Sequence, residues 1–250
     1  SDLAGIKTRA RIEGDELVIN GTKIWTSFAH VADWQELVIR TEPGSLRHKG
    51  LSWVICDMHS PGITIRPIRK ISGQTEFAQV FYDDVRIPLA NVVGGLGNGW
   101  RVSMSTLGFE RGTGFIADQV KNAIEVEELI DKARANGMIR DERIADDLAQ
   151  MRAEVAALRA MTYRNISEVI RTGQPGPEAS VIRLFTAELG QRIERMAVTL
   201  IGEEMVDFAY GDDDAVADYL RGFASTIAGG TAQIQRDIIG ERLLGLPKSR

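Results

Sequence analysis

The spacing of hydrophobic residues changes once along the chain, near residue 95. From Gly5 to about Asn91, short β-rich runs alternate with turn residues; the runs include Glu16–Ile19, Leu51–Cys56 and Val80–Tyr82. The pairs between such runs are typical of turns, and they are Asn20-Gly21, Pro43-Gly44 and Pro61-Gly62. The pattern predicts a small antiparallel, barrel-like β-domain over residues 1–95.

After the glycine-rich stretch Gly94–Gly99, hydrophobic residues recur at helical spacing. The expected helices cover Trp100 to about Asn136, Arg140–Thr172 and about Glu178 to Tyr210. A fourth helix starts at Asp212–Asp214, where acidic residues favour a helix N-terminus, and a last one follows Gly229-Gly230-Thr231. Long helices with short joins predict a four- or five-helix bundle over residues 96–250 and an α+β protein overall.

Composition narrows the class of protein. The 250 residues are 44% hydrophobic, enough to bury one large or two ordinary cores. A net charge of -5 argues against a surface that coats nucleic acid, although a local basic pocket could still hold an anionic ligand. No apolar run approaches the roughly 18 to 20 residues that span a bilayer, and no leader pattern opens the chain. We therefore expect a cytoplasmic protein.

Metal and thiol chemistry are not expected. The lone Cys56 cannot form an internal disulfide, and its strand-like surroundings indicate a small buried hydrophobic residue. His30, His48 and His59 lack the spacing of helical metal ligands and are interpreted as surface residues. The chain also lacks a phosphate-binding GxxxxGK[ST] motif. These observations exclude nucleotide-triphosphate hydrolysis and leave no metal centre to propose.

Glu110 is the acid with the least obvious structural role. In the expected helix its neighbours one turn away are small or uncharged, namely Thr106, Leu107, Thr113 and Gly114. Gly108, Gly112 and Gly114 crowd the same helix at a cost of roughly 1 kcal/mol each, which indicates that a ligand or another helix approaches its backbone. The alternative is that Glu110 forms an ion pair with Arg111, Arg101 or a cation on another helix.

Three segments of the chain are distinctive: Gly21–Ser27 (GTKIWTS), Phe81–Pro88 (FYDDVRIP) and Ser225–Arg236 (STIAGGTAQIQR). They resemble the acyl-CoA dehydrogenase family, in which FAD and an acyl thioester bind to a small β-domain and a helical domain. The resemblance covers nearly all of the chain. Ser1–Gly5 corresponds to a loop that follows the family's N-terminal helical domain, so we expect that domain to be missing from this sequence.

The resemblance implies where the catalytic base lies. Most family members carry a glutamate immediately before the Gly-Thr of the last helix, and Gly229 occupies that place here. A smaller group carries the base on the first helix after the β-domain, at a site that Phe109-Glu110-Arg111 matches. Glu110 is therefore expected to remove the α-proton, and desolvation would raise its basicity when substrate binds. The backbone N–H of Gly229 and a ribityl hydroxyl of FAD would stabilise the thioester oxyanion.

The resemblance also assigns binding roles. Trp25 would pack on the flavin ring, with Thr26 and Ser27 bonding its edge, and Thr231, Ala232 and Gln233 would hold FAD near the start of the last helix. Ser1, Arg111 and Gly230 would contact the thioester substrate. Without the resemblance, Trp25 would be a core residue and Thr231 only a helix cap.

The family's homotetramers carry an Arg-x-x-Phe-Gly and a Gly-Gly-x-Gly element that reach a neighbour's FAD, and this chain departs from both. The corresponding stretches, Glu127–Gly137 and Leu200–Phe208, are acidic where a pyrophosphate needs donors and cations. We therefore expect a heterotetramer with a second acyl-CoA dehydrogenase-like chain. Thr106–Thr113 (TLGFERGT) is similar to actinobacterial enzymes that act on steroid side-chain thioesters.

The expected function is FAD-dependent α,β-dehydrogenation of an acyl-CoA, possibly with a bulky or steroid side chain. Electron-transfer flavoprotein is the acceptor that the resemblance implies. Two alternatives remain at this point: a non-catalytic scaffold subunit and a flavin-dependent acyl-CoA oxidase.

Overall fold

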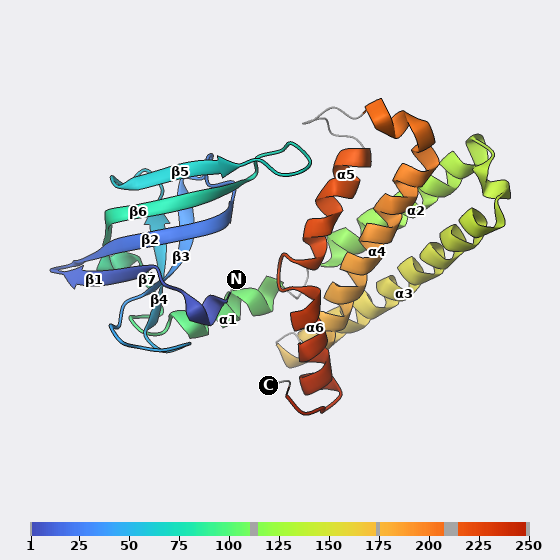
Figure 1. The fold of residues 1–250 in the computed structure, drawn as a ribbon. Coiled ribbons are helices and arrows are strands. Elements are labelled where there is room, and N and C mark those ends of the chain that lie inside the picture. Colours follow the sequence, from blue (N-terminus) through green and yellow to red (C-terminus); the bar gives the residue numbers. More distant parts are fainter. Residues whose placement is uncertain (1, 111–114, 174–175, 208–214, 249–250) are drawn as a thin grey trace. The chain divides into compact units, whose positions relative to one another are not determined.

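The computed structural model describes residues 2–110, 115–173, 176–207 and 215–248 (Figure 1). The chain divides into two compact units: one contains residues up to Lys70 together with Gln74–Thr106, and the other contains Ile71–Gly73 and the residues from Leu107 onward. The division falls within α1 (Gly99–Glu110), about ten residues after the glycine-rich stretch at which the hydrophobic spacing changes. A β-rich unit followed by a helical unit confirms the α+β class.

The first unit is built on one seven-stranded sheet of order β5-β6-β2-β1-β3-β4-β7. Six neighbouring pairs form it, and all are antiparallel except β1 with β3, which run parallel and meet at Arg9 and Arg40. The expectation of a wholly antiparallel domain is therefore wrong at this pair. The strands are β1 (Arg9–Glu13), β2 (Glu16–Ser27), β3 (Trp34–Arg40), β4 (Leu51–Asp57), β5 (Ile63–Ile68), β6 (Phe77–Pro88) and β7 (Val92–Val93).

Asn20-Gly21 lies inside β2 and not in a turn, so that prediction is wrong. Strand β2 pairs with β6 on both sides of these residues, and the register shifts between Ile19 and Gly21. Gly21 has a φ of 145°, and a Cβ there would lie 2.8 Å from the Cα of Thr8. The glycine therefore allows a bulge and a close approach of two backbones. Pro43-Gly44 and Pro61-Gly62 do lie in turns, as expected.

The core of this unit comes from strand residues that alternate in and out of the sheet. Along β6, Ala78, Val80 and Tyr82 point inward, and after Asp84, whose φ is 47°, the inward positions become Val85 and Ile87. Cys56 of β4 is fully buried in the same core, and burial raises the pKa of its thiol to about 11. The expectation that Cys56 is a buried hydrophobic residue is confirmed.

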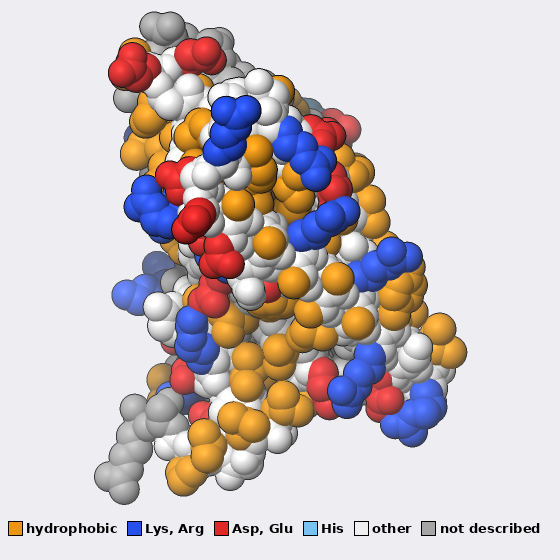
Figure 2. All heavy atoms as spheres, turned by 90° about the vertical axis from the view of Figure 1, so that its right-hand side faces the viewer, with side chains coloured by type: hydrophobic (Ala, Val, Ile, Leu, Met, Phe, Trp, Pro, Cys, Tyr) orange, Lys and Arg blue, Asp and Glu red, His pale blue; other side chains and the backbone are white. Residues whose placement is uncertain are grey.

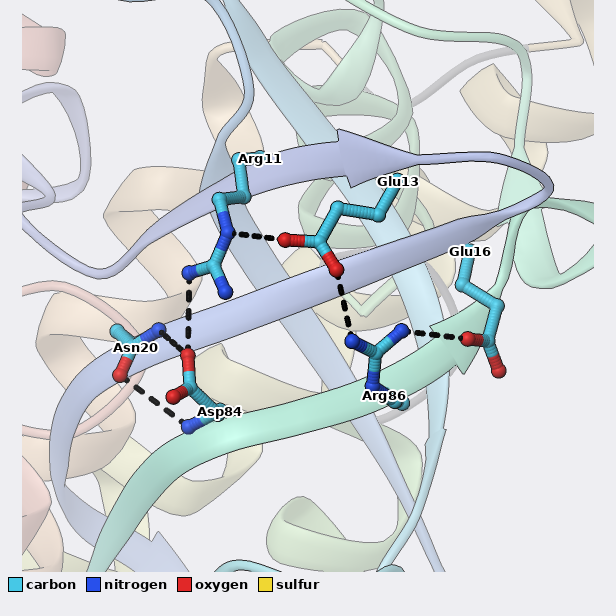
Figure 3. Close-up of polar contacts among 6 residues, drawn as sticks. All are labelled: Arg11, Glu13, Glu16, Asn20, Asp84 and Arg86. Carbon is cyan, nitrogen blue, oxygen red and sulfur yellow. Dashed lines mark hydrogen bonds and ion pairs between the residues drawn. The ribbon is translucent and has the colours of Figure 1, made fainter.

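The outer side of β1, β2 and β6 carries a chain of polar contacts (Figure 3). Arg11 bridges Glu13 at 2.6 Å and Asp84 at 3.0 Å, while Arg86 bridges Glu13 at 2.7 Å and Glu16 at 2.9 Å. The side chains of Arg11, Glu13, Asp84 and Arg86 are 40–63% exposed, so solvent screens each pair and each contributes little net stability. The contacts connect neighbouring strands, whose register is set by backbone pairing.

The second unit is helical. After the end of α1 it contains α2 (Phe115–Ala135), α3 (Glu142–Thr172), α4 (Glu178–Ile201), α5 (Ala215–Gly222) and α6 (Ala232–Ile238). The expected helix from Trp100 to Asn136 is described as α1 and α2, and the join between them lies outside the described residues. The N-cap Asp141 and the left-handed Gly173 bound α3, close to the expected limits.

Helix α4 ends earlier than expected. The prediction carried it to Tyr210, but it stops at Ile201 because Gly202 has a φ of 66° and a 3₁₀ segment, Gly202–Asp207, follows. Tyr210 and the acidic run Asp212–Asp214 lie outside the described residues, and α5 is described from Ala215 onward. The last helix begins after Thr231, as expected.

Helices α2, α3 and α4 share the hydrophobic core of this unit, and α5 and α6 pack along α4 (Figure 1). The side of the unit on which α3 runs shows basic, acidic and hydrophobic side chains intermixed (Figure 2). Such a surface lacks the single-sign field that steers nucleic acid. None of the helices in the described part is long and apolar enough to cross a bilayer.

Candidate active site

The segment before α6 is a tight loop that only glycine can form easily. Gly229 has a φ of 65° and Gly230 a φ of 98°, both in the left-handed region. Thr231 then caps α6, since its hydroxyl oxygen accepts a hydrogen bond of 3.3 Å from the backbone N–H of Ile234. The cap expected for Thr231 is confirmed, and its hydroxyl proton remains available for a further bond.

Arg183 of α4 holds one side of this loop. Its Nη2 atom donates to the carbonyl oxygens of Ser225 and Ala228, each at 2.6 Å. A Cβ on Gly229 would lie 3.4 Å from Nε of the same guanidinium. Burial lowers the pKa of Arg183 from its usual value, and the carboxylate of Asp118 opposes that shift. A desolvated cation therefore supports the backbone at the position where most of the family has the base.

Gln235 of α6 holds the other side. Its Nε2 atom donates to the carbonyl oxygens of Gly229 at 3.2 Å and Gly230 at 3.4 Å. The side chain is only 1% exposed, and its Oε1 atom has no hydrogen-bond partner among the described residues. The loop is thus fixed by two side chains that come from different helices. Arg183 was not a candidate in the sequence, because residues 183 and 229 are far apart along the chain. Gln235 lies within the Ser225–Arg236 segment, but the sequence does not show that its side chain turns back to the glycines.

Several of the expected site residues can be described only in part. Glu110 is the last residue of α1, but its side chain lies outside the described atoms, as do Ser1 and Arg111. A Cβ on Gly108 would meet no described atom within 4 Å. The expected close approach to that glycine is therefore absent within the described part of this chain, and the roles of Glu110, Ser1 and Arg111 stay predictions.

Trp25 is exposed, and its backbone is strained. It has a φ of 62° at a register shift in β2 between Lys23 and Thr26, and 54% of the residue is exposed. A bulky residue rarely adopts this conformation, and such strain is concentrated at functional sites. The edge of Phe77 supports the indole at a centroid distance of 6.1 Å. The alternative that Trp25 is a core residue is wrong.

Lys23 secures the same bulge. Its Nζ atom donates to the carbonyl oxygen of Val38 at 2.7 Å and so ties β2 to β3 beyond the end of β1. Burial lowers the pKa of this amine to about 8. The segment that presents Trp25, Thr26 and Ser27 is therefore anchored on two sides, by Lys23 and by Phe77.

The residues present fit a flavin. A rigidly held, exposed indole provides an apolar face for a planar heteroaromatic ring, and Ser27 beside it is an exposed hydroxyl donor. In the helical unit, the amide of Gln233 is exposed, and the hydroxyl of Thr231 donates to no other group among the described residues. His30, His48 and His59 are exposed, and no cluster that could hold a metal occurs among the described residues.

The two units match two family models in chain order. Residues 1–85 match the acyl-CoA dehydrogenase middle domain, and residues 97–244 match the acyl-CoA dehydrogenase C-terminal domain. The β-rich and helical units therefore correspond, in chain order, to the middle and C-terminal domains of this family. The chain belongs to the acyl-CoA dehydrogenase family, as the sequence motifs indicated.

Among curated proteins, the chain is similar to acyl-CoA dehydrogenase IpdE1 of Mycobacterium tuberculosis, at 40% identity over 249 residues. The alignment covers 99% of this chain and 64% of that relative, so the chain spans about two thirds of its length. Among solved structures it resembles the Tcur3481-Tcur3483 steroid ACAD, with a TM-score of 0.89 and 28% identity. The alignment covers 99% of this chain and 65% of that structure's chain. It also resembles the ChsE4-ChsE5 complex from Mycobacterium tuberculosis, with a TM-score of 0.81 and 30% identity. That alignment covers 99% of this chain and 66% of the chain in the complex.

Proposed function

We propose that the protein containing this chain catalyses FAD-dependent α,β-dehydrogenation of an acyl-CoA thioester. One observation carries the proposal: residue 229 offers only a backbone amide, held by Arg183 and Gln235, where most of the family has its base. An enzyme of this family then needs its carboxylate elsewhere, and Glu110 is the candidate. Bound FAD would supply the acceptor for the hydride that leaves the β-carbon.

Glu110 takes the proton from the carbon next to the thioester carbonyl. The electron pair of that C–H bond becomes the new double bond of the enoyl-CoA, and the hydride that leaves the β-carbon would pass to FAD when FAD is bound. Negative charge builds on the thioester oxygen in the transition state, and the N–H of Gly229 donates to it. Gly230 and Ala232 follow that donor along the chain and would contact substrate and FAD respectively.

Trp25 would cover one face of the flavin ring, and Thr26 and Ser27 would bond its edge. The strained, anchored bulge at Trp25 supports this role, since it holds the indole in one orientation at a cost of about 1 to 3 kcal/mol. Thr231 would donate its free hydroxyl proton and Gln233 its exposed amide. Ser1 and Arg111 are proposed to bind the thioester ligand.

A bulky, steroid-type acyl group is the proposed substrate, because the similar solved structure is described as a steroid ACAD. A second acyl-CoA dehydrogenase-like subunit is the proposed partner, because two similar structures carry the names of two chains each. The acidic character of Glu127–Gly137 supports that partnership. Electron-transfer flavoprotein is the proposed acceptor, and the cytoplasm is the proposed location.

The test is Glu110→Gln in the full-length protein, co-expressed with candidate partner chains. We expect bound FAD to be retained and turnover of steroid side-chain thioesters to be lost, because the amide keeps the volume but cannot accept a proton. Glu142→Gln, at the exposed first residue of α3, is the matched control and should retain full turnover.

Three results would contradict the proposal in different ways. Turnover retained in Glu110→Gln would remove the assignment of the base. Peroxide formed in step with turnover would identify an oxidase. A complex that binds FAD only on the partner chain and keeps its activity after Glu110→Gln would identify this chain as a scaffold subunit.

A further inference from the structure

Arg183 contacts the one peptide group on which the proposed oxyanion site depends. The carbonyl oxygen of Ala228 and the N–H of Gly229 belong to the same peptide unit, and none of the described peptide bonds is cis. A trans peptide is planar, so its C=O and N–H point in opposite directions. The bond of 2.6 Å from Arg183 to the Ala228 carbonyl therefore also fixes the direction of the Gly229 N–H.

From this geometry we infer that Arg183 is a positioning residue that orients and strengthens the N–H of Gly229 as an oxyanion donor. The inference rests on the proposed function. A hydrogen bond from a cation to a carbonyl draws electron density toward the oxygen and makes the N–H of the same amide a better donor. Because Arg183 is partly desolvated, this effect is weakly screened.

The neighbouring contacts prevent the peptide from turning. The same Nη2 atom also binds the carbonyl oxygen of Ser225 at 2.6 Å, which ties the preceding 3₁₀ turn to α4. On the far side, Gln235 binds the carbonyl oxygen of Gly229 and so fixes the next peptide unit. With the preceding turn tied to α4 and the following peptide held by Gln235, the N–H needs little reorganisation when charge develops, and this is the condition for strong electrostatic catalysis.

The backbone conformation explains why residue 229 has no side chain. A Cβ at 229 would make only an ordinary van der Waals contact with Nε of Arg183 at 3.4 Å, but the φ of 65° would strain any residue with a side chain. A carboxylate built from that Cβ would start beside a cation, which would hold its pKa low and make it a poor base. In this chain, position 229 is thus organised to present an amide and not a base.

The experiment compares Arg183→Met, Arg183→Lys and Arg195→Met in the full-length protein with its partner. Methionine keeps much of the packing but removes the donors, lysine keeps one cationic donor, and Arg195 is an exposed arginine on the same helix. We measure bound FAD, kcat and KM separately. The apparent pKa for enolisation of a bound 3-oxo analogue of the thioester is measured from its flavin charge-transfer absorbance.

Arg183→Met should lower kcat by about 10²- to 10³-fold with FAD content and KM little changed, as for loss of an oxyanion donor. The enolisation pKa of the bound analogue should rise, Arg183→Lys should be intermediate in both readouts, and Arg195→Met should match the unchanged protein. Normal kcat and normal enolisation in Arg183→Met would overturn the inference.

A structural role alone would give a different result. If Arg183→Met fails to fold or loses FAD, Arg183→Lys decides: wild-type kcat and enolisation in that variant would reject the positioning role, and a graded loss of both would support it. The proposed function fails separately, if the unchanged protein with its partner does not dehydrogenate any thioester.

Discussion

The carboxylate of Glu194 on α4 lies directly against the Cα of Gly222 at the end of α5. A Cβ at residue 222 would be 1.5 Å from Oε2 of Glu194 and 2.6 Å from its Cδ. Beside this contact, Gln191 donates to the carbonyl oxygen of Gly222 at 3.0 Å. Residue 222 therefore leaves space for this carboxylate, and a side chain there would force the carboxylate of Glu194 to move.

Gly222→Ala should destabilise the helical unit by about 1 to 3 kcal/mol, because the methyl group overpacks the contact with Glu194. Gly190→Ala is the matched control on α4, since a Cβ there would meet no described atom within 4 Å. It should stabilise the helix by up to about 1 kcal/mol, since alanine has the higher helix propensity. Far-ultraviolet circular dichroism in urea measures both effects.

A double-mutant cycle tests the cause. If Glu194 is the obstacle, Gly222→Ala should cost much less in a Glu194→Ser background, and the coupling energy should be about 0.5 to 3 kcal/mol. If Gly222→Ala lowers the free energy of unfolding equally in both backgrounds, the added methyl group clashes with a residue other than Glu194. Tryptophan fluorescence is unsuitable, because Trp25, Trp34, Trp53 and Trp100 all lie in the β-rich unit.

The same contact makes the stability of the helical unit depend on pH. Burial raises the pKa of Glu194 from 4.5 to about 7, with Glu125 of α2 and Asp218 of α5 adding like charge, while Lys121 and Arg221 oppose the shift. Between these two values the folded chain holds a proton that the unfolded chain has released. The contribution of the Glu194 carboxyl to the free energy of unfolding is therefore fully present below about pH 4.5 and is lost as the pH rises through about 7.

Glu194→Gln should flatten this dependence. Amide hydrogen exchange of α4 and α5, corrected for intrinsic rates, follows local stability in a protein with two units. A weaker slope of the same sign should remain, because burial also raises the pKa of Glu125. An unchanged slope in Glu194→Gln would show that another group titrates.

The exposed indole of Trp25 gives a prediction for flavin binding. Trp25→Ala should weaken FAD binding and raise flavin fluorescence, because the aromatic face that packs on the ring is removed, and a stacking loss of this kind is about 1 to 3 kcal/mol. Trp34→Ala is the control, since Trp34 on β3 is 58% exposed but has no left-handed backbone. Equal FAD affinity in both variants would remove Trp25 from the proposed site. Bound FAD is measured by titration of the full-length protein and partner.

Much of the fold followed from local pattern. Alternating residues in β4 and β6, the N-cap Asp141 and the left-handed Gly173 act over a few residues, so the sequence contains their signals directly. The prediction of a turn at Asn20-Gly21 was wrong because it also relied on a local signal alone. Its dipeptide is typical of a hairpin, but pairing with β6 on both sides of it keeps the strand extended.

The family and the segments proposed to bind flavin could also be identified from motifs, since Gly21–Ser27 and Ser225–Arg236 are short and contiguous. The exposure of Trp25 could not be predicted from the sequence. Whether an indole in a strand is buried depends on which face of the sheet packs against the hydrophobic core. The end of α4 could not be predicted either, because a glycine such as Gly202 can occur inside a helix at a modest cost in stability. In the structure, Gly202 has a φ of 66°, and this conformation ends α4.

The sequence by itself determined the order of the elements, the family and the absence of a side chain at residue 229. Only the tertiary structure showed what supports that residue: Arg183 on α4 reaches the carbonyl oxygen of Ala228, and Gln235 on α6 reaches that of Gly229. The physical reason is that periodicity and motifs report interactions between neighbours along the chain. A hydrogen bond between residues 183 and 228 exists only after two helices have packed side by side.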